Sequence, residues 1–467
     1  MKSCIHTLKA KEGERQIRVA VRNSQPRRSL EVPMYDSGTT AFMIAATALV
    51  VMMSPALALF YGGLSRKKNT INTMFMCLFA MCVVGCTWIL FGDSIAYGGS
   101  DAFDDAGNLV NAGALFFGGG DRLFSTWSLS ELLTGDIPED VAYPSTVSIA
   151  FQASFAMVTT AIVTGSLAGR LRFRALAVIV LLWPLLVYAP MAHMVWGGGI
   201  IGNANAIGAI DFAGGTAVHI CSGASGLVLA LMLKPRKDFG IGDHRPHNVA
   251  NIVIGTGLLF VGWFGFNGGS ALSADGNAGL AVLNTLVAAA AAGCCWSIIE
   301  VLRQGKPTVV GLCTGVLAGL VVVTPACGYV LPGIAVIMGL IVSPICYFFI
   351  STLKYKLGWD DALDAFGCHG VGGIVGALLT GVFALPQLSP TGVGGLIYTG
   401  SPALLGSQFV AVLFTLVFVC VLSFIIGLIA KAVCGGSMRV ASSVETQGLD
   451  VPVHAENCYP AFNGFDA

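Results

Sequence analysis

Eleven long apolar stretches, separated by shorter polar segments, fill most of the chain between residues 39 and 434. A helix needs about 20 apolar residues to cross the hydrocarbon core of a bilayer. The signal is weakest in the eighth stretch. We therefore predict an all-α integral membrane protein with eleven transmembrane helices. The predicted spans lie near residues 39–62, 72–92, 145–168, 175–195, 213–234, 249–268, 278–300, 308–326, 329–352, 365–385 and 404–434.

The composition indicates that lipid is the main solvent of this chain. Charged residues make up 11% of the 467 residues, hydrophobic residues 55%, and the mean hydropathy is +0.78. A typical soluble protein carries roughly 25% charged residues, so this chain lacks the charge to cover a soluble surface. The zero formal net charge gives no indication of a nucleic-acid partner. The fourteen cysteines are scattered and form no Cys-x-x-Cys pair, so we predict neither a metal site nor another cofactor.

Charge alternates between successive loops and predicts the orientation. Basic residues follow the odd-numbered spans, whereas the intervening loops have almost none. The loop 93–144 carries nine acidic residues and only one basic residue, Arg122. Because basic loops stay in the cytoplasm, we expect a multi-pass protein of the cell membrane with its N-terminus outside and its C-terminus inside.

Two polar segments flank the membrane domain, which we predict to span 39–435. Residues 1–38 form a basic extension that we expect to be disordered, and residues 436–467 form a cytoplasmic tail. The extension conflicts with an outside N-terminus, and it has no apolar region typical of a secretory signal. Translation from Met34 is the preferred interpretation, and export of the extension despite its charge is the alternative.

Two histidines stand out among the ionisable groups inside the predicted spans, where such groups are costly and are functional candidates. His219 is early in the fifth span and His369 early in the tenth, and each follows an aspartate, Asp211 or Asp364. If the chain is two inverted five-helix repeats plus a C-terminal helix, these positions are equivalent and meet near the midplane. The alternative is two separate structural histidines. Asp211 opens a helix and is interpreted as an N-cap in preference to a cation ligand.

Aromatic and polar residues gather at three predicted outer helix ends. Gln152 and Phe155 begin the third span, Trp196 follows the fourth, and Phe266 and Ser270 end the sixth. An aromatic face attracts a cation by roughly 0.5–2 kcal/mol, and a hydroxyl accepts a hydrogen bond from an N–H donor. An interfacial aromatic belt is the alternative for any single ring, but the convergence of three helix ends favours a cation site.

Five short motifs, taken together and in order, resemble the Amt branch of the Amt/Mep/Rh ammonium transporter family. The resemblance extends from about Asp36 to Tyr459. Each motif is weak alone, but the full order with a histidine in each half is highly specific. The motifs are Phe60-Tyr61-Gly62-Gly63-Leu64, Asp211-Phe-Ala-Gly-Gly-Thr, Phe266-Asn267-Gly-Gly-Ser270, Thr324-Pro325-Ala-Cys-Gly and Asp364-Ala-Phe-Gly-Cys-His369-Gly.

The resemblance implies an ammonium transporter rather than an enzyme, with a pore inside each subunit of a homotrimer. Trp196, Phe155 and Ser270 match the outer recruitment site for ammonium, and Phe155 and Phe266 match the rings that close the pore mouth. The loop that follows Trp196 is longer than usual for the family, and the outer loop 93–144 is expanded.

The two histidines match the twin histidines of a narrow hydrophobic lumen. The tail resembles the cytoplasmic segment through which Amt proteins couple subunits and meet PII-type signalling proteins. Cys221 and Cys368 lie near the histidines, and the sequence assigns them no function. The matching residues are His219 and His369 in the lumen, Asp211, Gln152, Thr324 and Asp364 as supporting positions, and Gly448, Asp450 and Tyr459 in the regulatory tail.

Three hypotheses follow for the function. In the first, ammonium gives up its proton at the outer site, ammonia crosses the apolar lumen, and the histidine pair carries the proton. In the second, the protein is an ammonium sensor that acts through its tail. The third, a membrane enzyme with a metal or haem, is disfavoured because the histidines lack neighbouring ligands.

Overall fold

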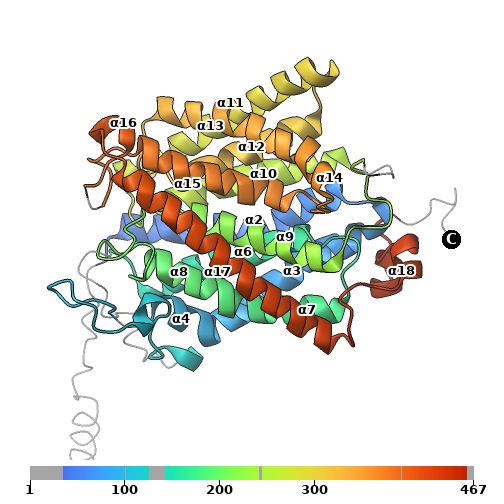
Figure 1. Ribbon diagram of the computed structural model, residues 1–467, viewed down its shortest axis with the longest axis horizontal. Coiled ribbons are helices and arrows are strands. Elements are labelled where there is room, and N and C mark those ends of the chain that lie inside the picture. The colour runs from blue at the N-terminus through green and yellow to red at the C-terminus, as the bar shows by residue number, and fades with distance from the viewer. Residues whose placement is uncertain (1–34, 100, 126–141, 241–244, 391, 460–467) are drawn as a thin grey trace, which may run out of the picture.

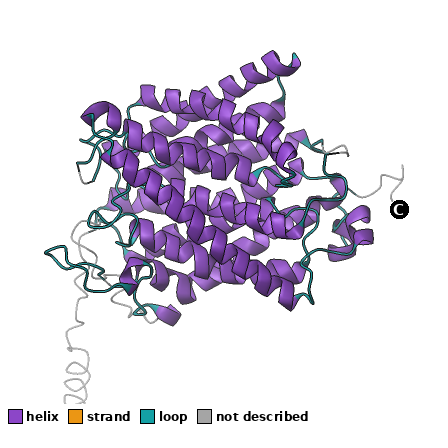
Figure 2. Ribbon diagram, in the orientation of Figure 1, coloured by secondary structure: helices purple, strands orange, loops and turns teal. Residues whose placement is uncertain are grey.

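The computed structural model is a bundle of helices, and it describes residues 35–99, 101–125, 142–240, 245–390 and 392–459. Figure 2 shows helices joined by loops, and the described part contains only two isolated β-bridges and no sheet. The predictions for residues 1–34 concern a segment outside the described residues.

Ten helical segments of the described chain are long and apolar enough to cross a membrane. The eleventh is α12, which has 15 residues and is followed by Thr324 and Pro325. Its short length explains why this span gave the weakest signal. The main helices are α2 (Ser37–Leu64), α3 (Thr70–Thr87), α4 (Asp93–Tyr97), α6 (Ser145–Gly165), α7 (Phe173–Trp183), α8 (Ala189–Trp196), α9 (Cys221–Leu233), α10 (Val249–Gly269), α11 (Gly276–Gln304), α12 (Val309–Val323), α13 (Pro332–Phe348), α14 (Lys354–Leu357), α15 (Val371–Phe383) and α17 (Ala403–Val433). A short helix, α16 (Leu396–Thr399), precedes α17.

Several spans contain a π-helical turn, in which backbone hydrogen bonds join residues five apart instead of the four of an α-helix. Such turns are often found at functional sites. Three of them divide spans: Trp88–Gly92 between α3 and α4, Pro184–Tyr188 between α7 and α8, and Phe349–Leu353 between α13 and α14. Two others, Gly215–Ile220 and Phe366–Gly370, lead into α9 and α15 and carry the two histidines.

The two halves pack on each other through reciprocal contacts of small residues. A Cβ atom on Gly223 of α9 would lie 2.4 Å from the backbone nitrogen of Gly370, in the turn before α15. A Cβ atom on Gly373 of α15 would lie 2.9 Å from the carbonyl oxygen of Gly215, in the turn before α9. This exchange of contacts is what two inverted repeats produce, and only glycine allows the backbones to approach so closely.

The tail lies against the loops that carry the basic residues. In Figure 1, α18 (Ser442–Gln447) is at one end of the bundle, and the loop after α4 is at the other end. The amide of Asn72 donates to Asp450 Oδ1 at 2.9 Å, and the amide of Leu449 donates to Asn69 Oδ1 at 2.9 Å. The tail and the basic loops therefore share one face of the molecule.

Candidate functional site

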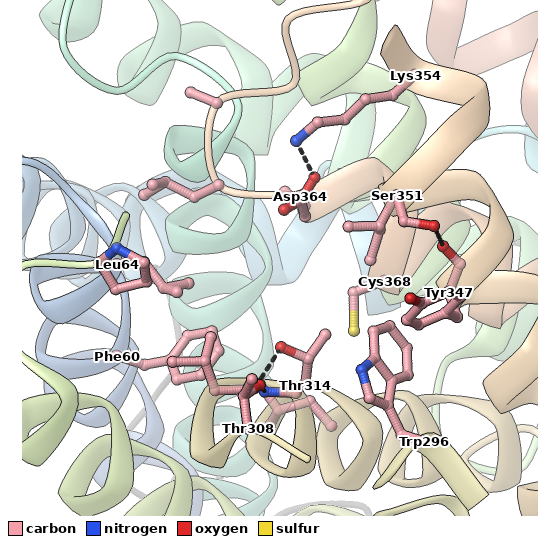
Figure 3. Close-up of a pocket in the computed structure, with 18 of the residues that line it drawn as sticks. Phe60, Leu64, Trp296, Thr308, Thr314, Tyr347, Ser351, Lys354, Asp364 and Cys368 are labelled. Carbon is pink, nitrogen blue, oxygen red and sulfur yellow. Dashed lines mark hydrogen bonds and ion pairs between the residues drawn. The ribbon is translucent and has the colours of Figure 1, made fainter. Parts of the chain in front are cut away.

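Three cavities follow one another through the bundle. The cavity on the side that the sequence predicts to face outward is called the outer cavity; it has a volume of about 460 Å³ and is lined by Phe155, whose ring stacks on Phe266. Phe266 lines the middle cavity, which is only about 10 Å³. The middle cavity shares Leu317 and His369 with the inner cavity of about 320 Å³, drawn in Figure 3. The stacked rings between the outer and middle cavities, and the linings that the middle and inner cavities share, place the three cavities on one path through a single chain.

The outer cavity brings together the residues that the sequence predicted at three helix ends. The ring of Phe155 meets Trp196 edge-on, with centroids 6.1 Å apart, and Ser270 lines the same cavity. Ser270 Oγ donates to the Phe266 carbonyl at 2.8 Å, so its oxygen lone pairs remain available as acceptors. Gln152 Oε1 is buried and has no hydrogen-bond partner among the described residues. The cavity thus offers aromatic faces and vacant acceptors.

Phe155 and Phe266 separate the outer cavity from the middle one. Their centroids are 4.0 Å apart, their planes differ by 22°, and their residues are 1% and 0% exposed. Their side chains must move, or a ligand must be small, for passage to occur.

The two histidines meet in the middle cavity. His369 Nδ1 lies 3.3 Å from His219 Nδ1, within hydrogen-bonding reach when one ring donates to the other. His219 Nε2 has no hydrogen-bond partner in the described part of the chain. The alternative of two separate histidines, each satisfied by a carbonyl, does not fit this geometry. The other lining residues are Met53, Leu57, Val158, Ile162, Leu259, Trp263, Phe266 and Leu317.

Thr324 supports this centre indirectly. Its Oγ1 accepts a hydrogen bond from Trp263 Nε1 at 2.9 Å, and the Trp263 ring stacks on His219 at 5.4 Å. Thr324 therefore orients a wall of the lumen rather than contacting the path itself.

Asp211 caps the turn that carries His219. Its Oδ1 accepts from the amides of Gly214 and Gly215 at 2.8 and 2.7 Å, and its Oδ2 accepts from the amide of Thr216 at 2.8 Å. These amides have no partner within the helix, and lipid offers no water to replace one. The Asp211 carbonyl also accepts from Trp196 Nε1 at 2.8 Å, so the cap fixes the indole at the outer cavity.

Asp361, which the sequence analysis did not select, caps the turn that carries His369. Its Oδ1 accepts from the amide of Ala365 at 3.1 Å, and its Oδ2 accepts from the amide of Phe366 at 2.8 Å. Asp361 precedes His369 by eight residues, the same interval that separates Asp211 from His219. This equal spacing was the signal that could have identified it.

Asp364, predicted as a supporting residue, lies at the inner cavity. It forms an ion pair with Lys354 at the inner cavity, and its backbone is left-handed with φ of 60°. Burial raises the pKa of the Asp364 carboxyl to about 6, although the charge of Lys354 opposes that rise.

A buried charge cluster, also missed from the sequence, lies beside Asp361. Asp360 accepts from Arg236 at 2.6 Å and lies 3.5 Å from Arg170, whose side chain is fully buried. Burial raises the pKa of Asp360, but the two guanidinium groups outweigh it and hold the pKa at about 2. No contiguous sequence motif identifies this cluster, because its members come from three separate loops.

The three predicted tail residues all contact the face that carries the basic loops. Gly448 has φ of 103°, and a Cβ atom there would lie 2.5 Å from Lys68 Cβ, so only glycine fits. Asp450 binds the amide of Asn72, as described above. The Tyr459 hydroxyl accepts from Asn248 Nδ2 at 2.5 Å.

The cysteines near the histidines are buried and unpaired. Cys221 follows the turn of His219, and Cys368 lines the inner cavity. Among the described residues, no group of three His, Cys, Asp or Glu side chains is arranged to hold a metal ion.

Comparisons with known proteins agree with this architecture. Residues 41–459 match the model of the Ammonium Transporter Family. The ammonium transporter of Aquifex aeolicus is 45% identical over 91% of this chain and 94% of its own length. The ammonium transporter of Bacillus subtilis is 41% identical over 90% of this chain and 98% of its own.

Solved structures of similar proteins share the fold. Mep2 of Saccharomyces cerevisiae aligns with a TM-score of 0.78 and 32% identity, covering 89% of this chain and 90% of that one. A structure described as a sensor Amt protein aligns with a TM-score of 0.78 and 28% identity, covering 89% of this chain and 98% of that one. The family match spans nearly the whole membrane domain, and the chain therefore belongs to the ammonium transporter family, a family of membrane transporters and not of enzymes.

Proposed function

We propose that the protein binds ammonium ion at the outer cavity, removes its proton, and passes ammonia through the lumen while His219 and His369 carry the proton. In this proposal the face with the basic loops and the tail is cytoplasmic. The subunits form a homotrimer, each with its own path, and the tail is the contact for a PII-type signalling protein.

The outer cavity suits a small monovalent cation. Trp196 and Phe155 offer aromatic faces worth roughly 0.5–2 kcal/mol each to a cation, more when water is excluded. Ser270 Oγ and Gln152 Oε1 offer acceptors that a tetrahedral N–H donor can use. Potassium has the charge of ammonium and also binds oxygen ligands, but it has no proton to give up, so the deprotonation step is what excludes it.

The middle cavity explains why the proton and the nitrogen must separate. Its lining is apolar apart from the two imidazoles, and its volume of about 10 Å³ leaves no room for a hydration shell. A bare cation there would lack solvation at a cost of many kcal/mol. Neutral ammonia does not face that cost, and potassium has no neutral form.

The histidine pair can accept the released proton and return it. One imidazole nitrogen takes the proton from ammonium as the N–H bond breaks, and the second ring shares it through the Nδ1–Nδ1 contact. The proton then rejoins ammonia at the inner cavity, so that ammonium is released and the pair is restored. Imidazole can both donate and accept, which suits it to this exchange.

The observation that supports this proposal most strongly is the hydrogen-bonded histidine pair, which lies in an otherwise apolar cavity between two larger cavities. The direct test is uptake of ammonium or methylammonium into proteoliposomes that contain the purified protein. We expect saturable uptake that a large excess of potassium does not inhibit. Uptake equal to that of empty liposomes would contradict the proposal.

A sensor role is the second candidate, favoured by the close contacts of the tail and by the similarity to the sensor Amt structure. Ammonium binding would then change the tail contacts without net uptake. Binding of ammonium with no flux in the same proteoliposomes would support this role instead.

A further inference from the structure

Lys354 places a buried ammonium group at the inner end of the path. Its side chain is only 5% exposed, it forms an ion pair with Asp364, and its Nζ lies 3.4 Å from the Asp361 carbonyl oxygen. Figure 3 shows the Lys354 nitrogen directed at the Asp364 carboxylate above the inner cavity. A primary ammonium group donates N–H bonds in the same way as ammonium ion itself.

Lys354 holds the position in the second half that Trp196 holds in the first. Each lies on the fourth span of its half, after a π-helical turn, at Pro184–Tyr188 or Phe349–Leu353. Each donates to the carbonyl of the aspartate that caps the following histidine turn: Trp196 to Asp211, and Lys354 to Asp361. The outer end therefore has a neutral ring that attracts a cation, whereas the inner end already has a cation.

The acids of the inner cavity are already occupied by donors. Lys354 binds Asp364, and Glu300 accepts from the amide and the hydroxyl of Thr308 at 2.7 and 2.9 Å. The outer cavity keeps Gln152 Oε1 without a partner among the described residues. Ammonium ion thus finds vacant acceptors on the outer side and occupied ones on the inner side.

We propose that Lys354 is a resident ammonium group that fills a cation site formed by Asp364, and that it thereby keeps the affinity of the inner cavity for ammonium ion low. Asp364 is then a latent ammonium site, and Lys354 favours release into the inner side. This inference rests on the proposed transport function.

The test uses ammonium-evoked currents in excised membrane patches, with ammonium applied to the inner or the outer face. Lys354→Met should lower the half-saturating ammonium concentration at the inner face at least fivefold and leave the outer-face value unchanged. The matched control is Lys356→Met, which removes an exposed lysine from the same short helix and should change neither value. An unchanged inner-face value in Lys354→Met, or an equal shift in Lys356→Met, would overturn the inference.

Two further variants make the test independent of folding problems in Lys354→Met. Lys354→Met/Asp364→Asn removes both charges and should return the inner-face value to that of the wild type. Asp364→Asn alone leaves the buried charge of Lys354 without its carboxylate partner, so the half-saturating ammonium concentration at the inner face should not fall. A lower inner-face value in Asp364→Asn would mean that the Asp364 carboxylate is not the latent ammonium site, and would overturn the inference. Absence of any current in the wild type would instead contradict the proposed function.

Discussion

The two histidine turns have the same local construction but different surroundings. In each, an aspartate eight residues earlier binds the free amides of a π-helical turn, and a glycine lets the partner helix approach. Around Asp211 the structure adds the Trp196 indole and an outer cavity with vacant acceptors. Around Asp361 it adds Lys354 and a buried charge cluster. The repeated construction therefore positions the two histidines, and we propose that the residues that differ between the halves give the two ends of the path different affinities for ammonium.

The largest expected effect follows from removing the part that both halves share. His219→Ala or His369→Ala removes one partner of the pair and breaks the Nδ1–Nδ1 contact through which the two rings share the proton. We expect the ammonium-evoked current to fall by more than tenfold in either variant, while size-exclusion chromatography shows an unchanged assembly. A wild-type current in both variants would remove the histidines from the mechanism.

Loss of the caps should have the next largest effect. Asp211→Ala and Asp361→Ala each leave several amides without an acceptor, and removal of one N-cap typically costs about 0.5–2 kcal/mol. Asp361 also accepts from Ser166 Oγ at 2.7 Å, so the thermal midpoint should fall further in its variant. Differential scanning fluorimetry measures the midpoint, and recordings should show a several-fold smaller current in both. Equal midpoints for both variants and the wild type would refute the capping role.

Removing Trp196 should reduce the difference in ammonium affinity between the two ends of the path. Trp196→Leu deletes the strongest cation–π partner of the outer cavity, so the half-saturating ammonium concentration at the outer face should rise several-fold. The inner-face value should stay unchanged. A shift of equal size at both faces would mean that the indole supports the fold rather than the outer site.

The tail should have a smaller effect on transport. Arg439 binds Glu445 at 2.7 Å, and the amide of Lys237 donates to Glu445 at 3.2 Å, so the tail contacts the loop that contains Arg236. Deletion from Ser437 onward should leave the outer half-saturation unchanged and lower the maximal current, measured in the same recordings. Failure of the truncated protein to assemble would show a structural role for the tail.

The smallest effect concerns acid stability. The pKa of Asp360 is held at about 2 in the folded protein, whereas an unfolded aspartate titrates near ~3.9. The folded state therefore gains stability that is complete above pH ~4 and is lost as the pH falls towards 2, on the order of 2 kcal/mol in total. Asp360→Asn should flatten this part of the stability–pH curve in detergent. A curve parallel to that of the wild type would contradict the pairing.

Hydrophobic pattern alone predicted the helices well, because a span must be long and apolar wherever it lies in the bundle. All eleven predicted spans correspond to helices, and the weakest is the short α12. The outer residues and the histidine pair were accessible from helix order and the inverted halves. Asp361 was missed because Asp364 stands closer to His369 in the sequence, although the eight-residue interval marks Asp361.

Neither the charge cluster nor the burial of Lys354 could be predicted from the sequence, because both depend on contacts between distant segments. Arg170, Arg236 and Asp360 belong to different loops, and their contacts depend on how the helix ends come together in three dimensions. In the sequence, Lys354 is only one of the basic residues that follow an odd-numbered span, and such residues normally mark the cytoplasmic side. Only the structure shows that its side chain is buried against Asp364.

The central claim is that ammonia and the proton both cross, with the histidine pair carrying the proton. The most direct measurement records current and ammonium uptake together in proteoliposomes, along with the internal pH. We predict about one positive charge moved for each nitrogen taken up, with little change in internal pH, because each ammonia that arrives is matched by a proton. Uptake that alkalinises the interior without current would show conduction of ammonia alone and would contradict the proton relay.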